Sequence, residues 1–96
     1  MTAYILGDIE IHDPAAYETY RARVPAVIAA HGGRYLVRGG ALERLDGNWN
    51  PKRLVVLEFP DMDRLRAFWN SPDYTPLRKI REASSTGRLI AVEGYA

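Results

Sequence analysis

The sequence predicts an α+β fold of the ferredoxin-like type, in which a four-stranded antiparallel sheet carries helices on one face. Two observations support this prediction. Hydrophobic residues recur every second position in some segments, as in strands, and at helical spacing in others, and these segments follow in the order β-α-β-β-α-β. The chain has 96 residues, 47% of them hydrophobic and 26% charged, which suits a single domain over residues 1–96. Right-handed crossovers place the first and third strands in the middle of the sheet.

The first strand and the first helix have clear boundaries. Residues 3–11 alternate between the two faces of a strand. Asp13 suits a helix cap, and Pro14 suits the first helical position, where an amide proton would be unpaired. We expect Pro25 to bend this helix or to break it locally. Gly32-Gly33 ends the helix, because glycine accepts the left-handed conformation of a C-terminal cap.

The middle of the chain predicts two strands and a loop. The second strand is expected over residues 33–39, and residues 41–45 could continue as a short edge strand. Turn-forming residues then fill 46–51. The run over residues 53–59 is almost continuously apolar, which is typical of a central strand.

The last third of the chain predicts a helical segment in two parts and a final strand. Asp61 can cap the first part, which ends at Asn70. Ser71-Pro72 starts the second part, with serine as its cap, and Gly87 ends it. The fourth strand is expected over residues 88–93.

Strand alternation divides the side chains between two faces of the sheet. The wholly apolar or aromatic face, expected under the helices, contains Ile5, Ile9, Ile11, Tyr35, Val37, Val55, Leu57, Phe59, Ile90 and Val92. The opposite face mixes aliphatic and charged residues and contains Leu6, Asp8, Glu10, Leu36, Arg38, Leu54, Val56, Glu58, Leu89, Ala91 and Glu93. Monomers rarely expose a large apolar patch, so we expect a two-fold homodimer through Leu6, Leu36, Val56 and Leu89. A monomer with a partly apolar open face is the alternative.

The composition argues against several partners and cofactors. Thirteen Lys and Arg balance twelve Asp and Glu with the signs mixed, so nucleic-acid binding has no electrostatic support. The chain has no cysteine, and His12 and His31 have no partner at metal-ligand spacing, so we expect no metal. No glycine motif fits a nucleotide, and we expect no cofactor. Neither a signal peptide nor a membrane span is predicted, and a cytoplasmic location is expected.

Several stretches resemble a known bacterial family. The most specific are Gly32–Gly40, which reads GGRYLVRGG, and Asn70–Tyr74, which reads NSPDY. The other matching stretches are Asp13-Pro14 with Tyr17, Trp49 with Pro51, Arg53–Pro60, Trp69, Arg81 and Val92–Gly94. Together they resemble the family called domain of unknown function 1330, within the dimeric α/β-barrel superfamily. The resemblance implies the fold and a dimer whose sheets face each other. Superfamily relatives include cofactor-independent monooxygenases, lactone isomerases and haem proteins, which is an analogy of fold alone.

The corner between the two parts of the second helical segment is the first candidate for a small-molecule site. The candidate ligand-binding residues are Asn70, Ser71, Tyr74, Arg81, Trp69, Tyr17 and Tyr20. A helix N-terminus with amide and hydroxyl groups suits an anionic or carbonyl oxygen, and flanking aromatic rings would form walls. Arg81 lies two helical turns beyond Tyr74 and could hold a carboxylate. The structural alternative is that Ser71 only caps a helix and the aromatic residues only fill the core.

Arg38, Glu58 and His31 are secondary candidates. Arg38 and Glu58 share the predicted open face with Asp8, where the charges either fix the register of a dimer or bind a ligand carboxylate, with Glu58 as base. We expect Arg38 to pair with a carboxylate on that face, from Glu58, Asp8 or the other subunit, since an unpaired charge among aliphatic residues is unfavourable. His31 either complements the helix dipole or moves a proton. Trp49 is either an arm on a partner subunit or a lid.

Two functions fit these features, and the sequence leaves open whether the protein is an enzyme. The protein binds or transforms a small aromatic or carboxylate-bearing metabolite in a cleft between sheet and helices, or it is a non-catalytic dimeric module. A solvent-reachable pocket lined by the candidate aromatic residues would favour the first function.

Overall fold

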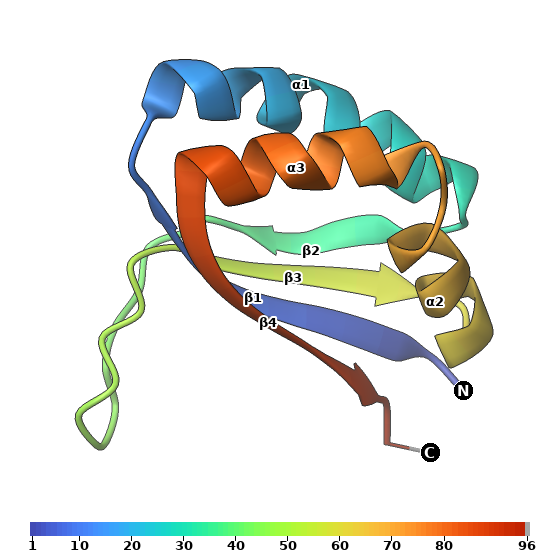
Figure 1. The fold of residues 1–96 in the computed structure, drawn as a ribbon. Helices are drawn as coiled ribbons and strands as arrows, with labels where there is room; N and C mark the ends of the chain where they lie inside the picture. Colours follow the sequence, from blue (N-terminus) through green and yellow to red (C-terminus); the bar gives the residue numbers. More distant parts are fainter. Residues whose placement is uncertain (96) are drawn as a thin grey trace.

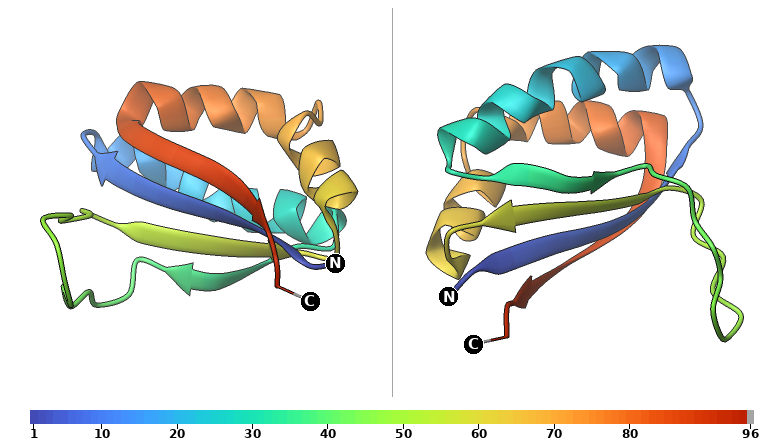
Figure 2. Two further views of the ribbon diagram at one scale, coloured as in Figure 1. Left: turned by 90° about the horizontal axis from the view of Figure 1, so that it is seen from below. Right: turned by 180° about the vertical axis from the view of Figure 1, so that it is seen from behind.

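The computed structural model describes residues 1–95, which form a four-stranded antiparallel sheet in the order β2-β3-β1-β4. The elements are β1 (Ala3–Ile11), α1 (Pro14–Ala30), β2 (Arg34–Arg38), β3 (Leu54–Phe59), α2 (Met62–Trp69), α3 (Tyr74–Ser84) and β4 (Ser85–Glu93). All three helices lie on one side of the sheet, with α1 and α3 running side by side (Figures 1 and 2). The predicted ferredoxin-like fold, with the first and third strands in the middle, is confirmed. Within residues 1–95, no helix has both the length and the apolar character needed to cross a bilayer.

The helix caps form at the predicted residues. Asp13 accepts a hydrogen bond from the amide of Ala16 at 3.1 Å, and Asp61 accepts one from the amide of Arg64 at 2.7 Å. Helix α1 continues through Pro25 without a break. Proline cannot donate to the carbonyl four residues earlier, which belongs to Arg21. That carbonyl accepts a hydrogen bond at 2.6 Å from a side chain of the sheet, that of Arg38, instead.

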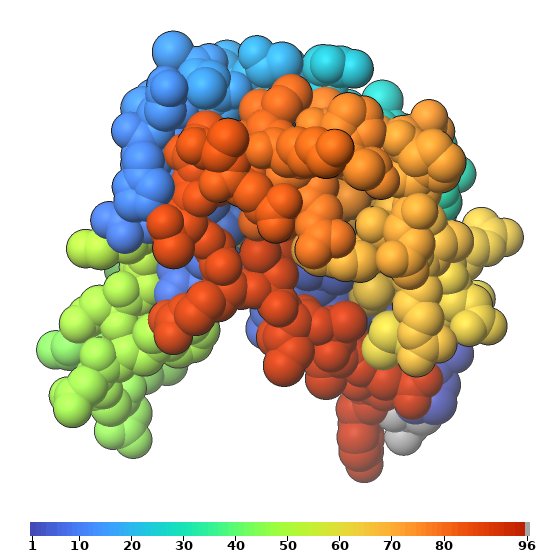
Figure 3. All heavy atoms as spheres, viewed as in Figure 1, coloured from blue at the N-terminus to red at the C-terminus, as the bar shows by residue number. Residues whose placement is uncertain are grey.

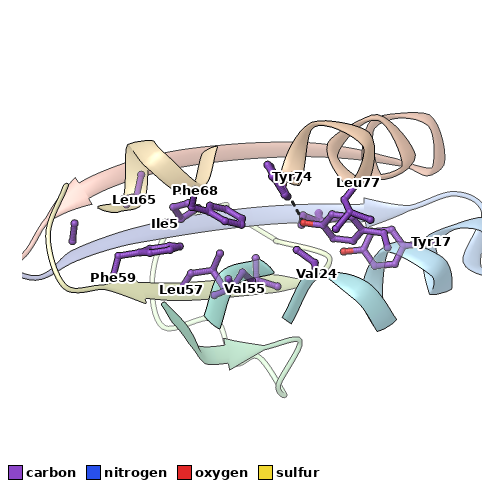
Figure 4. Close-up of a cluster of buried hydrophobic side chains, with 14 residues drawn as sticks. Ile5, Tyr17, Val24, Val55, Leu57, Phe59, Leu65, Phe68, Tyr74 and Leu77 are labelled. Atoms are coloured by element: carbon purple, nitrogen blue, oxygen red, sulfur yellow. Dashed lines mark hydrogen bonds between the residues drawn. The ribbon is translucent and has the colours of Figure 1, made fainter. Parts of the chain in front are cut away.

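The core fills the layer between the helices and the inner face of the sheet (Figure 4). Phe68 and Tyr74 from the two ends of the α2–α3 corner pack with their ring centres 4.4 Å apart, and Phe59 of β3 lies 5.2 Å from Phe68. Each large side chain buried in this way contributes about 1.5–3 kcal/mol relative to exposure. The aromatic residues therefore join α2 and α3 to the sheet.

The faces of β4 are the reverse of the prediction. Gly7 pairs with Leu89 and Leu6 pairs with Ile90, so Leu89 and Ala91 face the helix side. Ile90 and Val92 face the open side, where they are 67% and 46% exposed. Leu89 and Ala91 on one face of this strand and Ile90 and Val92 on the other are all aliphatic. Hydrophobicity alone therefore does not predict which face packs against the helices.

Strand β2 contains a bulge that the sequence did not reveal. Tyr35 pairs with Leu57, but Val37 pairs with Val56 and Arg38 with Val55, so the register shifts by one residue. Val37 therefore faces the open side, and Arg38 faces the helices. Both are on the opposite face from the one predicted.

Two other boundaries differ from the prediction. Helix α3 ends at Ser84 rather than at Gly87, because the hydroxyls of Ser84 and Ser85 donate to the carbonyls of Ile80 and Arg81, at 2.6 and 2.5 Å. Strand β4 is correspondingly longer at its start. Residues 41–45 form no strand; they belong to an extended segment over residues 39–53, here called the arm, which projects below the sheet (Figure 1).

Asp8 on the open face anchors the base of the arm. Its carboxylate accepts hydrogen bonds from the indole of Trp49 and the amide of Lys52, both at 3.2 Å, and lies 3.3 Å from the guanidinium of Arg88. Partial burial raises the pKa of Asp8, but the three hydrogen bonds and the charge of Arg88 together bring this pKa below its ordinary value. The ionised carboxylate is therefore the form that the folded arm stabilises.

We expect Asp8→Asn to weaken the pH dependence of stability in acid. The pKa of Asp8 is lower in the folded chain, so its contribution is fully present above the unfolded pKa of about 3.9 and is lost as the pH falls through the folded value. Urea unfolding followed by circular dichroism at pH 6 and pH 3 should show a smaller difference for the variant than for the wild type. The matched control is Asp63→Asn, because Asp63 is almost fully exposed. An equal acid sensitivity of wild type and Asp8→Asn would contradict the expectation.

Candidate functional site

A cavity of about 20 Å³ lies between the helices and the inner face of the sheet. Its lining comprises Ile5, Ile9, Tyr17, Tyr20, Tyr35, Arg38, Arg53, Val55, Leu57, Phe68, Trp69, Tyr74 and Leu89. Four tyrosines, two arginines and a tryptophan are among these residues, but neither aspartate nor glutamate is. The cavity therefore combines aromatic walls with uncompensated positive charge. In this conformation it has room for about one water molecule.

The tyrosines bring hydrogen-bonding hydroxyls into an otherwise apolar interior. The hydroxyls of Tyr20 on α1 and Tyr74 on α3 lie 3.1 Å apart, the interaction drawn as a dashed line in Figure 4. Tyr17 packs against Tyr20 with ring centres 5.3 Å apart. Burial, with a further contribution from Tyr74, raises the pKa of Tyr20 far above its ordinary value. This hydroxyl stays protonated at neutral pH and can serve as a donor, not as a base.

Arg38 closes the cavity on the β2 side. Its guanidinium lies 4.5 Å from the ring centre of Tyr35 and donates to the carbonyl of Arg21. The prediction that Arg38 pairs with Glu58 or Asp8 on the open face is wrong, because Arg38 faces the helices and none of the ion pairs within residues 1–95 includes it. Glu58 pairs instead with Arg34 at 2.8 Å on the open face. Arg38 and Glu58 lie on opposite faces of the sheet, so they do not form one site.

Arg53 is a cavity residue that the sequence reading missed. Its Nε is buried and has no hydrogen-bond partner within residues 1–95. Gly39, which has a φ of 70°, has no side chain, and the guanidinium of Arg53 occupies the position where one would be. A Cβ at residue 39 would collide with Nη1 of Arg53. A signal was present in the sequence. Arg53 occupies the position that the alternation of Val55 and Leu57 assigns to the inner face.

Arg81 lies behind Trp69 at the β4 side of the interior. It is only 4% exposed, and its Nε has no hydrogen-bond partner within residues 1–95. Its guanidinium lies 5.9 Å from the ring centre of Trp69 and lies over Gly87, where a Cβ would approach Nη1 to 3.3 Å. Arg81 also lines a surface groove of about 320 Å³ between α3 and β4. Trp69 and Leu89 line both this groove and the cavity, so their side chains separate the two.

The polar groups of the α2–α3 corner bond mostly within the corner itself. The hydroxyl of Ser71 accepts a hydrogen bond from the amide of Tyr74 at 3.1 Å, as expected of a capping side chain. The helix nevertheless begins at Tyr74 rather than Pro72, and Asp73, directly before it, makes no side-chain capping bond. The amide nitrogen of Asn70 donates to the carbonyl of Arg66 at 3.0 Å. Asn70 lines a second surface groove, of about 460 Å³, together with Trp69 and Leu89. Neither Asn70 nor Ser71 lines the cavity.

His31 lies at the C-terminal end of α1, away from the cavity. Its Nδ1 donates to the carbonyl of Val27 at 3.0 Å, and its ring packs edge-on against Phe68 at 5.9 Å. Among residues 1–95, no group of three or more His, Asp or Glu side chains is arranged to hold a metal ion. The structure thus brings together Tyr17, Tyr20, Tyr74 and Trp69 of the first candidates, with Arg81 beside them.

Comparison with known proteins supports the fold over the whole chain. The family described as Domain of unknown function (DUF1330) matches residues 2–95. A protein of unknown function from Rhodopseudomonas palustris is similar, with a TM-score of 0.79 and 19% identity, over 99% of this chain and 83% of that one. No curated protein sequence matches this chain.

Two other solved structures are similar in fold. SnoaB, a cofactor-independent oxygenase from Streptomyces nogalater, has a TM-score of 0.67 and 22% identity, over 99% of this chain and 94% of its own. A dimeric ferredoxin-like protein of unknown function from Jannaschia sp. has a TM-score of 0.66 and 15% identity, over 98% of this chain and 100% of its own. At these identities the likeness extends to the fold alone.

The hydrogen bond from Arg38 to α1 predicts an interaction with Pro25. We expect Arg38→Met to destabilise the protein by about 1 kcal/mol, because it leaves the carbonyl of Arg21 without its donor. In a Pro25→Ala background, the alanine amide can donate to that carbonyl, and the same substitution should be less destabilising. A double-mutant cycle by urea unfolding measures this coupling. Equal losses in the two backgrounds would show that the carbonyl does not depend on Arg38.

Proposed function

The chain belongs to the DUF1330 family, and we propose that it binds a small aromatic molecule carrying a carboxylate or another anionic oxygen, in the space between helices and sheet. The observation that supports this most strongly is the buried cation Arg81, which lies beside an aromatic interior and has no carboxylate partner within residues 1–95. Burying a charge is unfavourable unless it is paired and hydrogen-bonded. A ligand carboxylate would supply the missing partner, and a guanidinium binds it through two parallel hydrogen bonds.

The aromatic residues would determine the rest of the ligand. Trp69, Tyr17 and Tyr20 present flat apolar surfaces, which suit a planar ring. The hydroxyls of Tyr20 and Tyr74, which lie 3.1 Å apart, could present a donor to a carbonyl or phenolic oxygen. The oxygenase activity in the description of SnoaB is a property of that protein, and here it is an analogy of fold.

Ligand entry would require Trp69 to move. The cavity of about 20 Å³ is too small for an aromatic ring, whereas the neighbouring grooves measure about 320 and 460 Å³. Trp69 and Leu89 line all three spaces. The indole is half-buried and stacks under the guanidinium of Arg78 at 4.4 Å. A rotation of Trp69 away from Tyr74 would join the cavity to a groove and place Arg81 at the junction.

We also propose a homodimer through the open face of the sheet. Ile90, Val92 and Val37 are exposed there, beside the half-buried Leu54 and Val56. Figure 3 shows the arm and the end of β4 projecting on either side of a hollow below the sheet, which a groove of about 440 Å³ occupies. Relative to the sequence-based expectation, Ile90 takes the place of Leu89, which faces inward. The similar Jannaschia protein is described as dimeric.

A non-catalytic dimeric module is the second candidate function. The small volume of the cavity and the local hydrogen bonding of Ser71 and Asn70 favour it, since both are features of a filled structural core. Under this alternative the buried arginines contribute only packing, through their aliphatic stems and their contacts with aromatic rings.

Binding of an aromatic carboxylate should depend on Arg81. We expect benzoate or a hydroxybenzoate to quench or shift the fluorescence of Trp69 in a Trp49→Phe protein, and to raise its melting temperature. Arg81→Met should weaken this binding about tenfold or more, as expected for a lost charge-assisted pair. Arg23→Met is the matched control, because Arg23 is exposed on α1. Equal effects of both substitutions on affinity, or a stability loss in Arg81→Met without a change in affinity, would favour the structural alternative.

The dimer should dissociate when a charge is placed on the open face. We expect Ile90→Asp or Val37→Asp to yield a monomer in size-exclusion chromatography with light scattering, because an unpaired buried charge destabilises an interface by several kcal/mol. Ala83→Asp, at an exposed position on α3, should leave the assembly unchanged. A wild-type protein that is monomeric at micromolar concentration would refute the proposed dimer.

A further inference from the structure

We propose that the ligand of this interior carries two anionic groups, one held by Arg81 at the β4 side and the other by Arg53 with Arg38 at the β2 side. The inference rests on the proposed function and specifies its substrate class as an aromatic dicarboxylate or a similarly spaced dianion. Two observations lead to it: Arg81, without a carboxylate partner, lies on one side of the aromatic interior behind Trp69 and Leu89, and Arg53 and Arg38, also without one, line the other side.

The sheet register places the two cationic ends at the same level of the sheet. The amide of Ile9 donates to the carbonyl of Arg53 at 2.9 Å, and on its other side Ile9 pairs with Gly87 of β4. Arg53 and Gly87 therefore flank Ile9 on neighbouring strands. The guanidinium of Arg81 lies over Gly87, while that of Arg53 lies in the space beside Gly39 at the end of β2.

The separation of the two ends suits a molecule of one aromatic ring. Gly39 and Gly87 are three strand spacings apart, which corresponds to about 14 Å. A guanidinium carbon lies roughly 4 Å from a carboxylate carbon that it binds through two hydrogen bonds. About 6 Å then remains between the two carboxylate carbons. A benzene ring substituted at positions 1 and 4 has this length.

The β2 end has the character of a built anion site. The Nε of Arg53 is buried and without a hydrogen-bond partner, and the guanidinium of Arg38 has only the carbonyl of Arg21 as a partner, both within residues 1–95. The two cations lie near the hydroxyl of Tyr35, whose pKa is raised by burial and lowered in part by the charges of Arg38 and Arg53. Gly39, at a φ of 70° and without a side chain, leaves the space that Arg53 fills. Two cations in a lining without carboxylates repel each other, and a bound anion would relieve that repulsion.

Once Trp69 has rotated as proposed above, the lining between the two ends, as far as residues 1–95 describe it, contains neither aspartate nor glutamate to repel such a ligand. Ile9 forms the floor on β1, and Tyr17, Tyr20 and Tyr74 lie above it on α1 and α3. Hydroxyls and aromatic rings can contact a flat ring without desolvating a further charge. Arg81, Arg53 and Arg38 would therefore recognise the ends of the ligand, and the tyrosines its middle.

The test compares a probe that has one carboxylate with probes that have two, on the full-length protein. The affinities of benzoate, phthalate (carboxylates at positions 1 and 2) and terephthalate (positions 1 and 4) are measured by calorimetry for wild type, Arg53→Met, Arg53→Lys and the control Arg23→Met. We expect terephthalate to bind wild type at least tenfold more tightly than benzoate or phthalate. Arg53→Met should remove this advantage and leave benzoate unchanged. Arg53→Lys, which keeps the charge but loses the planar fork, should retain part of it.

The possible results separate the inference from the proposed function. Equal affinities of benzoate and terephthalate, or an equal loss of both in Arg53→Met, would overturn the two-ended ligand while the proposed aromatic carboxylate site still stands. Absence of binding by all three probes to wild type would overturn both. Arg53→Lys keeps the inference falsifiable if Arg53→Met does not fold, since a terephthalate affinity unchanged in that variant would also contradict it.

Discussion

The hydrogen bond between the guanidinium of Arg38 and the carbonyl of Arg21 connects the sheet to the long helix at the edge of the interior. Three local features make it possible. Pro25 leaves the carbonyl without its helical donor, the bulge in β2 turns Arg38 inward, and Tyr35 supports the guanidinium from below. Each of these features would be unfavourable or neutral in isolation. Together they fix a cation at the boundary of the cavity without a carboxylate, and so they determine the chemistry of that side of the interior.

The pairing of β1 with its two neighbours determines which other side chains enter the interior. A shift of one residue in either register would exchange the two faces of a strand. On the β3 side, Ile5 opposite Leu57 brings Val55 and Arg53 to the helix face. On the β4 side, Ile9 opposite Gly87 leaves a space in the strand, and the guanidinium of Arg81 lies over it. The same registers direct Ile90 and Val92 outward. The pairing of β1 with its neighbours therefore determines both the apolar open face and the position of the arginines in the interior.

The parts of the fold that depend on local chemistry could be predicted from the sequence. Asp13 and Asp61 are caps because their side chains accept hydrogen bonds from amides that have no partner within the helix. The parts that depend on pairing could not be predicted. The bulge in β2 reverses Val37 and Arg38, and no residue in that strand marks it. In β4 both alternating sets are aliphatic, so only the partner strand selects one of them. Of the residues around the cavity, the sequence singles out the aromatic cluster and, beside it, Arg81. It does not single out Arg53, although the strand alternation assigns Arg53 to the inner face.

Buried arginines without carboxylates are difficult to explain as a device for stability. Replacing a buried charged group by an apolar side chain of similar volume is often neutral or stabilising. A core selected for stability alone would therefore hold Leu or Met at the positions of Arg53 and Arg81. The cation–π contact of Arg81 with Trp69 offsets part of the desolvation of Arg81, by about 0.5–2 kcal/mol, but it does not satisfy the directional N–H groups. Unpaired polar groups in an otherwise apolar core are expected at functional sites, where a ligand can supply their hydrogen-bond partners. Here the unpaired donors lie at the two ends of one aromatic layer, and the half-buried Trp69 separates that layer from the surface grooves. This arrangement fits the proposed site for an anionic ligand, because such a ligand would supply acceptors for these donors.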